Sequence, residues 1–275
     1  MLSLNTNAAA LSAQNSVGAT QKALSTSMTR LSTGYRVNSA MDDAAGLQIA
    51  TRLDAQTRGQ AVAQRNTQNG VSMMQTAEGA FNEVTDMLLR MKDLATESAN
   101  ATSNTSDKTA MDSEFKALSA ELTNITTNTK FGGQALFTAG TLAAPAVFQI
   151  GSASSETYSF DASTQLTAMS TAQTALAGGN LVTGGNAAID LANTMIDKVG
   201  ELRAALGAGA NRLDHVFNNL GNMVTNVSAA RGRIMDVDYA SESANMTSKQ
   251  MLMQASSAML KQSSSMSQLV ASLLQ

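Results

Sequence analysis

Proline is almost absent from this chain, and this constrains the fold more than any other feature of the sequence. The single proline, Pro145, stands between two long stretches rich in Ala, Leu, Met, Gln, Lys and Glu. A proline inside a helix costs about 3 kcal/mol, whereas the residues of these stretches are good helix formers. The sequence therefore predicts long helices on both sides of residue 145.

The composition favours contacts between helices over a compact core. Apolar residues make up 43% of the chain, but many are Ala, Met, Leu and Val, and only 4% of all residues are aromatic. A compact enzyme core usually contains more rings. The formal net charge is only −3 and the basic residues are spread out, so we expect no nucleic-acid partner.

Cysteine is absent, which excludes disulfides, zinc–thiolate sites and thiol nucleophiles. The first residues show no basic region followed by an apolar segment, and no stretch approaches a membrane-spanning length. We therefore expect no membrane partner. If the protein leaves the cell, we expect a route other than the general secretory one.

Both ends of the chain carry apolar residues at helix spacing. The N-terminal stripe shifts its phase by one residue partway along and comprises Leu4, Ala8, Leu11, Val17, Leu24, Met28 and Leu31. The C-terminal stripe comprises Leu252, Ala255, Met259, Met266, Leu269 and Leu273. Each stripe could belong to an amphipathic helix on its own core. Two such stripes in one chain favour paired terminal helices whose Ala- and Met-rich flanks contact other subunits.

Between the two ends the sequence predicts further helices and one β-hairpin. Residues 44–128 have the pattern of two helices, with a break at 100–107 where Asn, Ser and Thr cluster. Short alternating stretches at 146–150 and 157–161 predict the hairpin. A glycine-rich passage then leads into a last internal helix at about 187–226.

The sequence contains no convincing catalytic group. Its only histidine, His215, has no metalloprotease motif around it. The tightest carboxylate groups are Asp42 with Asp43 and Asp236 with Asp238, and they fall at expected helix junctions, where acidic side chains cap exposed amides. The glycine pairs lack the lysine and the setting of a phosphate loop. We expect no catalytic residue, no cofactor and no metal.

Several blocks of the sequence resemble the bacterial flagellin family. The most specific block is LSTGYRVNSAMDDAAGL at residues 31–47. Other similar blocks are RNTQNGVS at 65–72, QTAEGA at 75–80, TKFGG at 129–133, GAGANRL at 207–213, ARGRIMDVDYASE at 230–242 and the closing residues 250–275. Residues 145–185 are unmatched, as in the variable middle of the family.

The chain departs from the family pattern in three ways. Ser267 stands where members often have a proline, so we expect a straighter final helix, and Gln275 stands where the last residue is often basic. The residues after the hairpin are too few to build the large outer domain that many members carry. We therefore expect a thin, smooth filament.

The resemblance implies a mainly α fold, with long helices in an antiparallel coiled-coil-like bundle, a small β-hairpin, and the termini paired as an inner coiled coil. An inner filament-core domain would comprise residues 1–43 and 233–275. A helical outer domain would comprise residues 44–232, with the hairpin around 131–161 and a short variable segment around 162–185.

The resemblance also implies a non-enzymatic function. The chain would be a flagellin that polymerises into the extracellular flagellar filament for swimming, after export in unfolded form through the flagellum's own channel. Its terminal helices would be largely disordered until assembly. Its partners would be other copies of itself, the flagellar cap and hook–filament junction proteins, and an export chaperone on the C-terminal helix.

One further implication concerns a host. Flagellins of many bacteria are sensed by a Toll-like receptor through a helical patch, which Arg90, Leu94 and Glu114 resemble. The alternative is that these three residues serve subunit packing alone.

Three other functions compete with a flagellin. A hook–filament junction protein has similar ends, but it usually has prolines flanking the paired aspartates, and residues 39–44 contain none. A soluble coiled-coil adaptor would explain the stripes but not the matched blocks. A proteolytic flagellin would need a zinc motif in the middle of the chain, which this sequence lacks.

Overall fold

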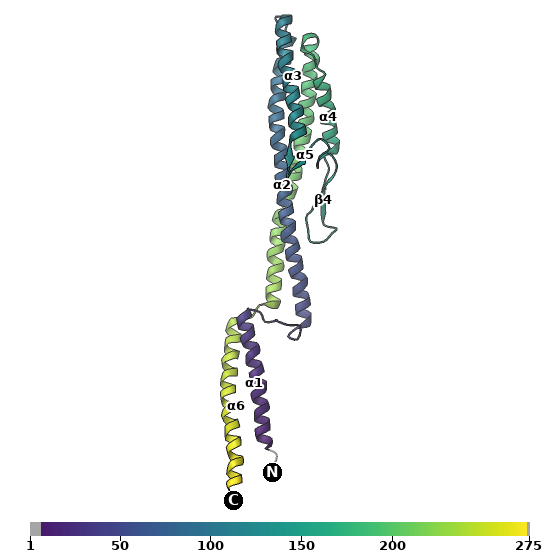
Figure 1. The fold of residues 1–275 in the computed structure, drawn as a ribbon. Coiled ribbons are helices and arrows are strands. Elements are labelled where there is room, and N and C mark those ends of the chain that lie inside the picture. Colours follow the sequence, from purple (N-terminus) through teal and green to yellow (C-terminus); the bar gives the residue numbers. More distant parts are fainter. Residues whose placement is uncertain (1–6, 274–275) are drawn as a thin grey trace. The chain divides into compact units, whose positions relative to one another are not determined.

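The protein is described by a computed structural model that covers the backbone of residues 7–273 and the side chains of residues 7–265. The helices in this range are α1 (Ala8–Thr33), α2 (Ala44–Ala99), α3 (Thr105–Asn128), α4 (Ser163–Ala177), α5 (Leu181–Met235) and α6 (Tyr239–Leu273) (Figure 1). The short strands are β1 (Lys130–Phe131), β2 (Gln134–Ala135), β3 (Ala146–Gln149) and β4 (Thr157–Phe160). The predicted mainly α fold class is confirmed, and a second small hairpin, β1–β2, accompanies the predicted one, β3–β4.

Contacts divide the chain into two compact units. Unit 1 comprises Met1–Ala55 and Asn226–Gln275, and unit 2 comprises Gln56–Thr225. These boundaries fall inside α2 and α5, whereas the sequence predicts domain boundaries at the helix junctions, near residues 43 and 233. The predicted domain limits stay a prediction.

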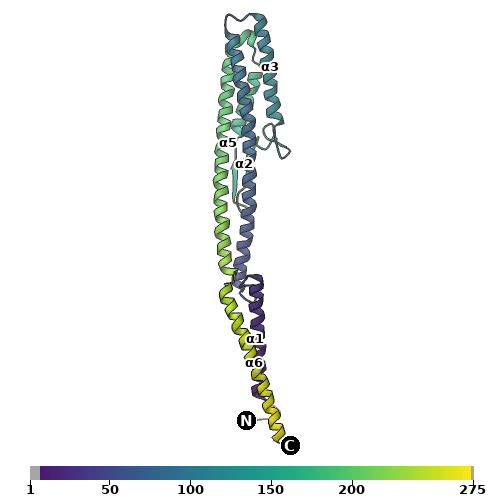
Figure 2. The ribbon, with the colours of Figure 1, turned by 90° about the vertical axis from the view of Figure 1, so that its left-hand side faces the viewer.

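Unit 2 is built on the antiparallel pair of α2 and α5. Gly70 of α2 lies against Leu213 of α5, and further along α2 the Oε1 atom of Glu78 lies 3.9 Å from Nη2 of Arg203. Residues later in α2 therefore contact residues earlier in α5, which makes the two helices antiparallel. Their ribbons run side by side in Figures 1 and 2. A 3.1 Å hydrogen bond from Gln173 Nε2 to Thr123 Oγ1 joins α4 to α3.

The hydrophobic core lies in unit 2. Its largest fully buried side chains are Phe81, Phe115, Met74, Leu88, Met91, Leu122, Leu136, Leu142, Met169, Leu176, Leu181 and Met195. The rings of Phe81 and Phe137 lie 4.6 Å apart between centroids. Burial of these side chains at about 25 cal/mol per Å² of apolar surface is the main stabilisation of the unit.

The β3–β4 hairpin packs on the helix pair at positions without side chains. Phe148 lies against Gly70 of α2, and Phe160 lies against Gly209 of α5. The guanidinium carbon of Arg212 lies 4.4 Å from the ring centroid of Tyr158. Glycine allows this close approach because any larger residue would hold the sheet away from the helices.

The turn between α2 and α3 lies where it is predicted. It covers residues 100–104, because α2 ends at Ala99 and α3 begins at Thr105. Asn104 and Asp107 form a capping box, in which each side chain accepts a hydrogen bond from the other residue's backbone N–H.

The segment from 162 to 185 is more ordered than predicted. It contains helix α4, whose buried residues Leu166, Met169, Ala172 and Leu176 recur at spacings of three and four. Helix α5 also begins at Leu181, before the predicted residue 187, and it continues past the predicted end at residue 226. The sequence predicts a glycine-rich passage before this helix, whereas residues 184–185 lie within α5 and Gly184 forms a kink in it.

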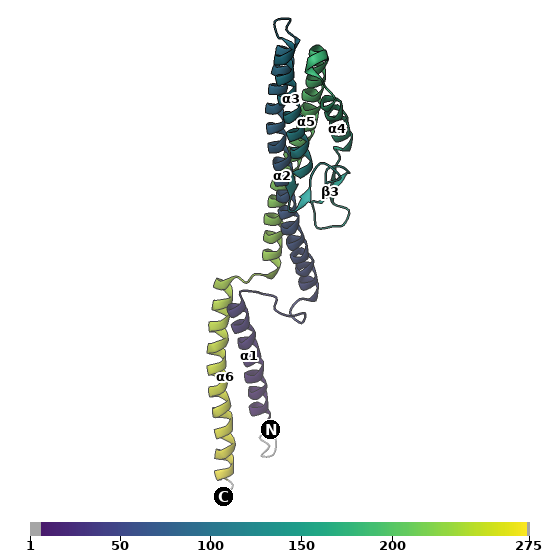
Figure 3. The ribbon, with the colours of Figure 1, turned by 45° about the horizontal axis from the view of Figure 1, so that its top comes forward.

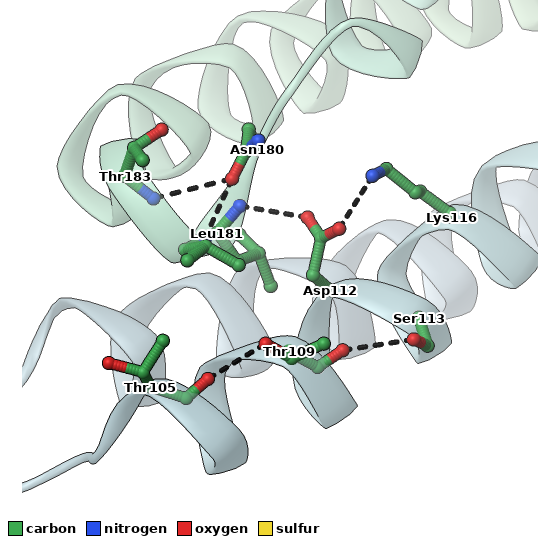
Figure 4. A network of polar contacts seen from close by, with 9 residues as sticks. Thr105, Thr109, Asp112, Ser113, Lys116, Asn180, Leu181 and Thr183 are labelled. Carbon is green, nitrogen blue, oxygen red and sulfur yellow. Dashed lines mark hydrogen bonds and ion pairs between the residues drawn. The ribbon is translucent and has the colours of Figure 1, made fainter.

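Two polar side chains explain why α5 begins at Leu181 (Figure 4). The carboxylate of Asp112 in α3 accepts the Leu181 N–H at 2.9 Å, and Asn180 Oδ1 accepts the Val182 N–H at 2.8 Å. Burial raises the pKa of Asp112, but its bonds to Lys116, 2.6 Å away, and to Leu181 outweigh this effect and keep the pKa below its usual value. These bonds satisfy amides that a helix leaves free at its start.

Along the described part of the chain, none of the helices has an apolar stretch long enough to span a lipid bilayer.

Candidate functional site

The candidate site is the surface of the two terminal helices in unit 1. Helices α1 and α6 lie side by side and antiparallel in all three views (Figures 1, 2 and 3). At one end of the pair Asn7 Nδ2 donates to the Ser263 carbonyl at 3.1 Å. At the other end Arg30 Nη1 lies 3.8 Å from Glu242 Oε2.

We call the facing surfaces of these helices the paired face. Its residues are less exposed than their neighbours and recur at alternating spacings of three and four. In α1 they are Ala10, Ala13, Val17, Thr20, Leu24, Ser27 and Leu31. In α6 they are Glu242, Met246, Lys249, Met253, Ser256, Leu260 and Ser263. This unbroken heptad pattern is typical of a coiled coil.

The N-terminal stripe predicted from the sequence is only partly on the paired face. Val17, Leu24 and Leu31 lie there, whereas Leu11 and Met28 are exposed. The predicted phase shift does not occur, because Ala10 and Ala13 occupy the paired positions before Val17 and continue the same heptad. Leu4 lies outside the described residues.

In α6 the predicted stripe is not the row that packs on α1. The paired face uses Met253 and Leu260, whereas Leu252 and Met259, one residue earlier in each case, are exposed. Helix α6 carries two adjacent apolar rows, and the sequence does not show which of them faces α1. The side chains of Met266, Leu269 and Leu273 lie outside the described residues.

Few side chains of the paired face are fully buried. Among the described side chains of α1 and α6, only those of Ser27 and Glu242 are buried. All residues of the hydrophobic core belong instead to unit 2. Because stability scales with the apolar area removed from water, the α1–α6 pair gains little from its own packing.

Helix α6 nevertheless exposes large apolar residues. Met251, Leu252 and Met259 form what we call the exposed apolar row, with Met251 60% and Met259 68% exposed. At 3.6 residues per turn these three residues fall within an arc of about 100° around the helix. Such a row of exposed apolar residues is a candidate surface for contact with another molecule.

The connections at the ends of the terminal helices are held by backbone hydrogen bonds. The Arg36 N–H donates to the Met235 carbonyl at 2.6 Å, and the Val237 N–H donates to the Gly34 carbonyl at 3.0 Å. Gly34 adopts a left-handed conformation, with φ of 75°, at the end of α1. The segment that leaves α1 is therefore hydrogen-bonded to the segment that enters α6.

The paired carboxylates at these junctions serve structure, as predicted. Asp43 Oδ1 accepts the Gly46 N–H at 2.8 Å, and Asp238 Oδ1 accepts the Ala240 N–H at 3.0 Å, as capping side chains do. The Ser241 hydroxyl and the Ala240 N–H lower the pKa of Asp238.

Asp42 has a different structural role, because it closes the turn before α2. Its Oδ2 atom accepts the N–H groups of Asn38 at 3.1 Å and Ser39 at 2.9 Å. These two backbone hydrogen bonds lower the pKa of Asp42.

The three residues of the possible receptor patch lie at different depths. Arg90 Nε donates to Glu114 Oε1 at 2.8 Å, and this pair is exposed between α2 and α3. Leu94 is only 2% exposed and belongs to the core. The patch stays a prediction, and any direct contact with it would involve the ion pair and not Leu94.

The candidate groups for chemistry are not brought together. His215 is exposed on α5. Within the described range, no three His, Cys, Asp or Glu side chains are grouped so that they could hold a metal ion.

Comparisons with known proteins agree with the resemblance seen in the sequence. The family model for the bacterial flagellin N-terminal helical region matches residues 4–141, and the one for the bacterial flagellin C-terminal helical region matches residues 187–274. A flagellin of Halalkalibacterium halodurans is 39% identical over 98% of this chain and 99% of the relative. Flagellin A of Vibrio anguillarum is 32% identical over all of both chains.

Among solved structures, the crystal structure of Bacillus cereus flagellin is 34% identical and covers 61% of this chain and 94% of its own, with a TM-score of 0.49. The two family models leave residues 142–186 unmatched, which agrees with the variable middle expected from the sequence. Because the models match most of the chain and the relatives align over nearly all of it, the chain belongs to the bacterial flagellin family.

Proposed function

We propose that this chain is the subunit that forms the main length of a flagellar filament for swimming, and not a junction protein. Membership of the family makes it a structural subunit of an extracellular flagellar filament. The further step is that the surface of α6 drives polymerisation with other copies of the same chain.

One observation supports this proposal most strongly. The apolar residues of the paired face are only partly buried, while the exposed apolar row of α6 stands in solvent. A contact between that row and a different surface on the next copy generates a helical polymer when successive copies do not close into a ring. Burial of the row would then supply the stabilisation that the helix pair lacks.

Order in the terminal helices would follow from the same contact. Fixing the backbone of a residue costs about 1–2 kcal/mol, and a pair of helices with few buried apolar side chains does not offset this cost. Contacts with neighbouring subunits would provide the remainder. The free subunit is therefore expected to have labile ends, and the filament to have ordered ones.

The junction protein remains the competing function. The turn that Asp42 closes contains Ser39, Ala40 and Met41 and no proline, which supports the filament subunit on the pattern of the resemblance. The two roles also differ in how many copies of the chain assemble, because a filament subunit must polymerise without limit.

The experiment uses purified protein and flagellated bacteria. Seeded polymerisation of the subunit alone, followed by electron microscopy, should yield filaments that lengthen with added protein. Expression of this gene alone in a strain without flagellins should restore swimming, whereas expression in a strain without junction proteins should not. Rescue of the junction defect together with absence of long polymers would contradict the proposal.

Three partner assignments go with this function. The filament would grow between the cap and the junction proteins, and the subunit would reach the tip through the flagellar channel. The exposed apolar row supports binding of an export chaperone to α6, which pull-down with and without residues 239–275 would test. The exposed Arg90–Glu114 pair supports Toll-like receptor detection, which reporter cells given Arg90→Ala protein would test.

A further inference from the structure

Methionine exposure differs sharply between the two units. In unit 2, Met73, Met74, Met91, Met169 and Met195 are buried in the core. The exposed methionines among the described side chains are Met28, Met41, Met251 and Met259, and all four belong to unit 1. Two of these four lie in the exposed apolar row of α6.

We propose that Met251 and Met259 are oxidation sites, and that their conversion to methionine sulfoxide prevents the free subunit from polymerising. This inference rests on the proposed function, because it requires the exposed apolar row to be buried between copies. The oxidant is a two-electron oxygen donor such as hydrogen peroxide. One oxygen atom passes to the thioether sulfur, which is oxidised, and the peroxide is reduced to water.

Accessibility makes the reaction selective. Oxidation of methionine follows exposure, so Met251 and Met259, at 60% and 68% exposure, react before the methionines of the core. The chain has no cysteine that would react first with the oxidant. The core of unit 2 is therefore left intact under mild treatment.

The effect on assembly follows from polarity. A sulfoxide on the free subunit is solvated and costs little, because these side chains are already exposed. In an apolar contact between subunits the same oxygen would lose its water without gaining a donor. Each buried sulfoxide is then expected to raise the concentration of subunit needed for polymerisation about tenfold or more.

Met41 provides a matched control. It is 97% exposed, in the turn before α2 and outside the exposed apolar row. It is therefore expected to oxidise as readily as Met251 and Met259, but its oxidation should not change polymerisation through this row.

The test compares four proteins: the wild type, Met259→Leu, Met251→Leu combined with Met259→Leu, and Met41→Leu. Free subunits are treated with hydrogen peroxide, the peroxide is removed, and sulfoxide is located by peptide mass spectrometry. Seeded polymerisation is then measured by sedimentation, and thermal unfolding by circular dichroism. Leu is close to Met in size and resists oxidation, so each variant should polymerise before treatment.

The expected result is loss of polymerisation in oxidised wild type and in oxidised Met41→Leu, retention in the double variant, and partial retention in Met259→Leu. Methionine sulfoxide reductases should restore the wild type. The melting of unit 2 should not change. Met251 and Met259 should also oxidise more slowly in filaments than in free subunits.

An equal loss of polymerisation in the oxidised double variant would overturn the inference. Equal oxidation of the two methionines in filament and free subunit would also overturn it, because the row would then be uncovered. Failure of the untreated wild type to polymerise at all is a different outcome, which contradicts the proposed function itself.

Discussion

Replacement of Gly209 by alanine is a direct test of how the β3–β4 hairpin packs on α5. A Cβ atom at this position would lie 2.8 Å from Cδ2 of Phe160 and 3.0 Å from Cε of Met74. Carbon atoms in favourable contact are about 3.5–4.0 Å apart, so the hairpin or the helix would have to move. We therefore expect Gly209→Ala to destabilise unit 2.

The size of the effect can be isolated with a second glycine in the same helix. A Cβ at Gly207 would meet nothing within 4 Å. Alanine in place of glycine in a helix interior gains about 1 kcal/mol, and this gain applies to both variants. Overpacking costs about 1–3 kcal/mol and applies to Gly209→Ala alone. The two variants should therefore differ by the overpacking cost.

The assay is thermal and urea unfolding of the free subunit, followed by circular dichroism. Gly207→Ala should melt slightly above the wild type. Gly209→Ala should melt below Gly207→Ala by about 2–4 °C for each kcal/mol of overpacking, as expected for a unit of this size. Equal melting temperatures for the two variants would show that Phe160 does not pack against α5 as the structure has it.

Other predictions concern assembly, acid stability and proteolysis. Met259→Asp should block polymerisation, measured by sedimentation, because a charge buried between subunits costs several kcal/mol, whereas Met259→Leu should still polymerise. Normal filaments from the Asp variant would show that Met259 does not lie in the contact between subunits. Asp112→Asn should lower the free energy of unfolding by about 1 kcal/mol at pH 7 through its weaker bonds to Lys116 and Leu181. Because the folded-state pKa of Asp112 is lowered, its contribution is complete above the unfolded pKa and is lost as the pH falls below about 4. Urea unfolding from pH 7 to pH 3 should therefore show the free energy of unfolding of the variant approaching that of the wild type. A difference in this free energy that stays constant with pH would contradict the prediction. Limited proteolysis should remove α1 and α6 from the free subunit but not from the filament, and equal protection would mean that the helix pair is self-sufficient.

Local chemistry explains which parts of the fold could be predicted from the sequence. The α2–α3 turn follows from a cluster of Asn, Ser and Thr, and the capping box of Asn104 and Asp107 is visible in the sequence itself. The β3–β4 hairpin follows from alternation, and the roles of Asp43 and Asp238 follow from their places before helices. Each of these features depends on residues a few positions apart.

Helix α4 shows what the sequence prediction missed although a signal was present. Leu166, Met169 and Leu176 have helical spacing, but the sequence analysis assigned no helix between the predicted hairpin and residue 187. The early start of α5 has a local signal in Asn180, whose side chain accepts the Val182 N–H. It depends in part on Asp112, which lies far away in the sequence and caps Leu181 from another helix.

The candidate site could be predicted only to the level of the helix, and not of the face. Both terminal helices were identified correctly, but the heptad that packs on α1 includes Lys249, Ser256 and Ser263, which no search for apolar stripes would select. Leu252 and Met259 formed the clearer apolar pattern and are exposed. The choice between two adjacent rows depends on the partner helix and on which contacts form inside one subunit.

The distribution of side chains on α6 differs from that of a self-sufficient coiled coil. Such a pair buries its largest apolar residues and leaves charged ones outside. Here Glu242 is buried on the paired face within 3.8 Å of Arg30, while Met259 is exposed. An ion pair in which only the carboxylate is buried contributes little net stability but disfavours other registers, since a shift of α6 along α1 would leave Glu242 without its partner. The paired face therefore sets the alignment of the two helices, and under the proposed function a contact that covers the adjacent exposed apolar row of α6 would supply the remaining free energy.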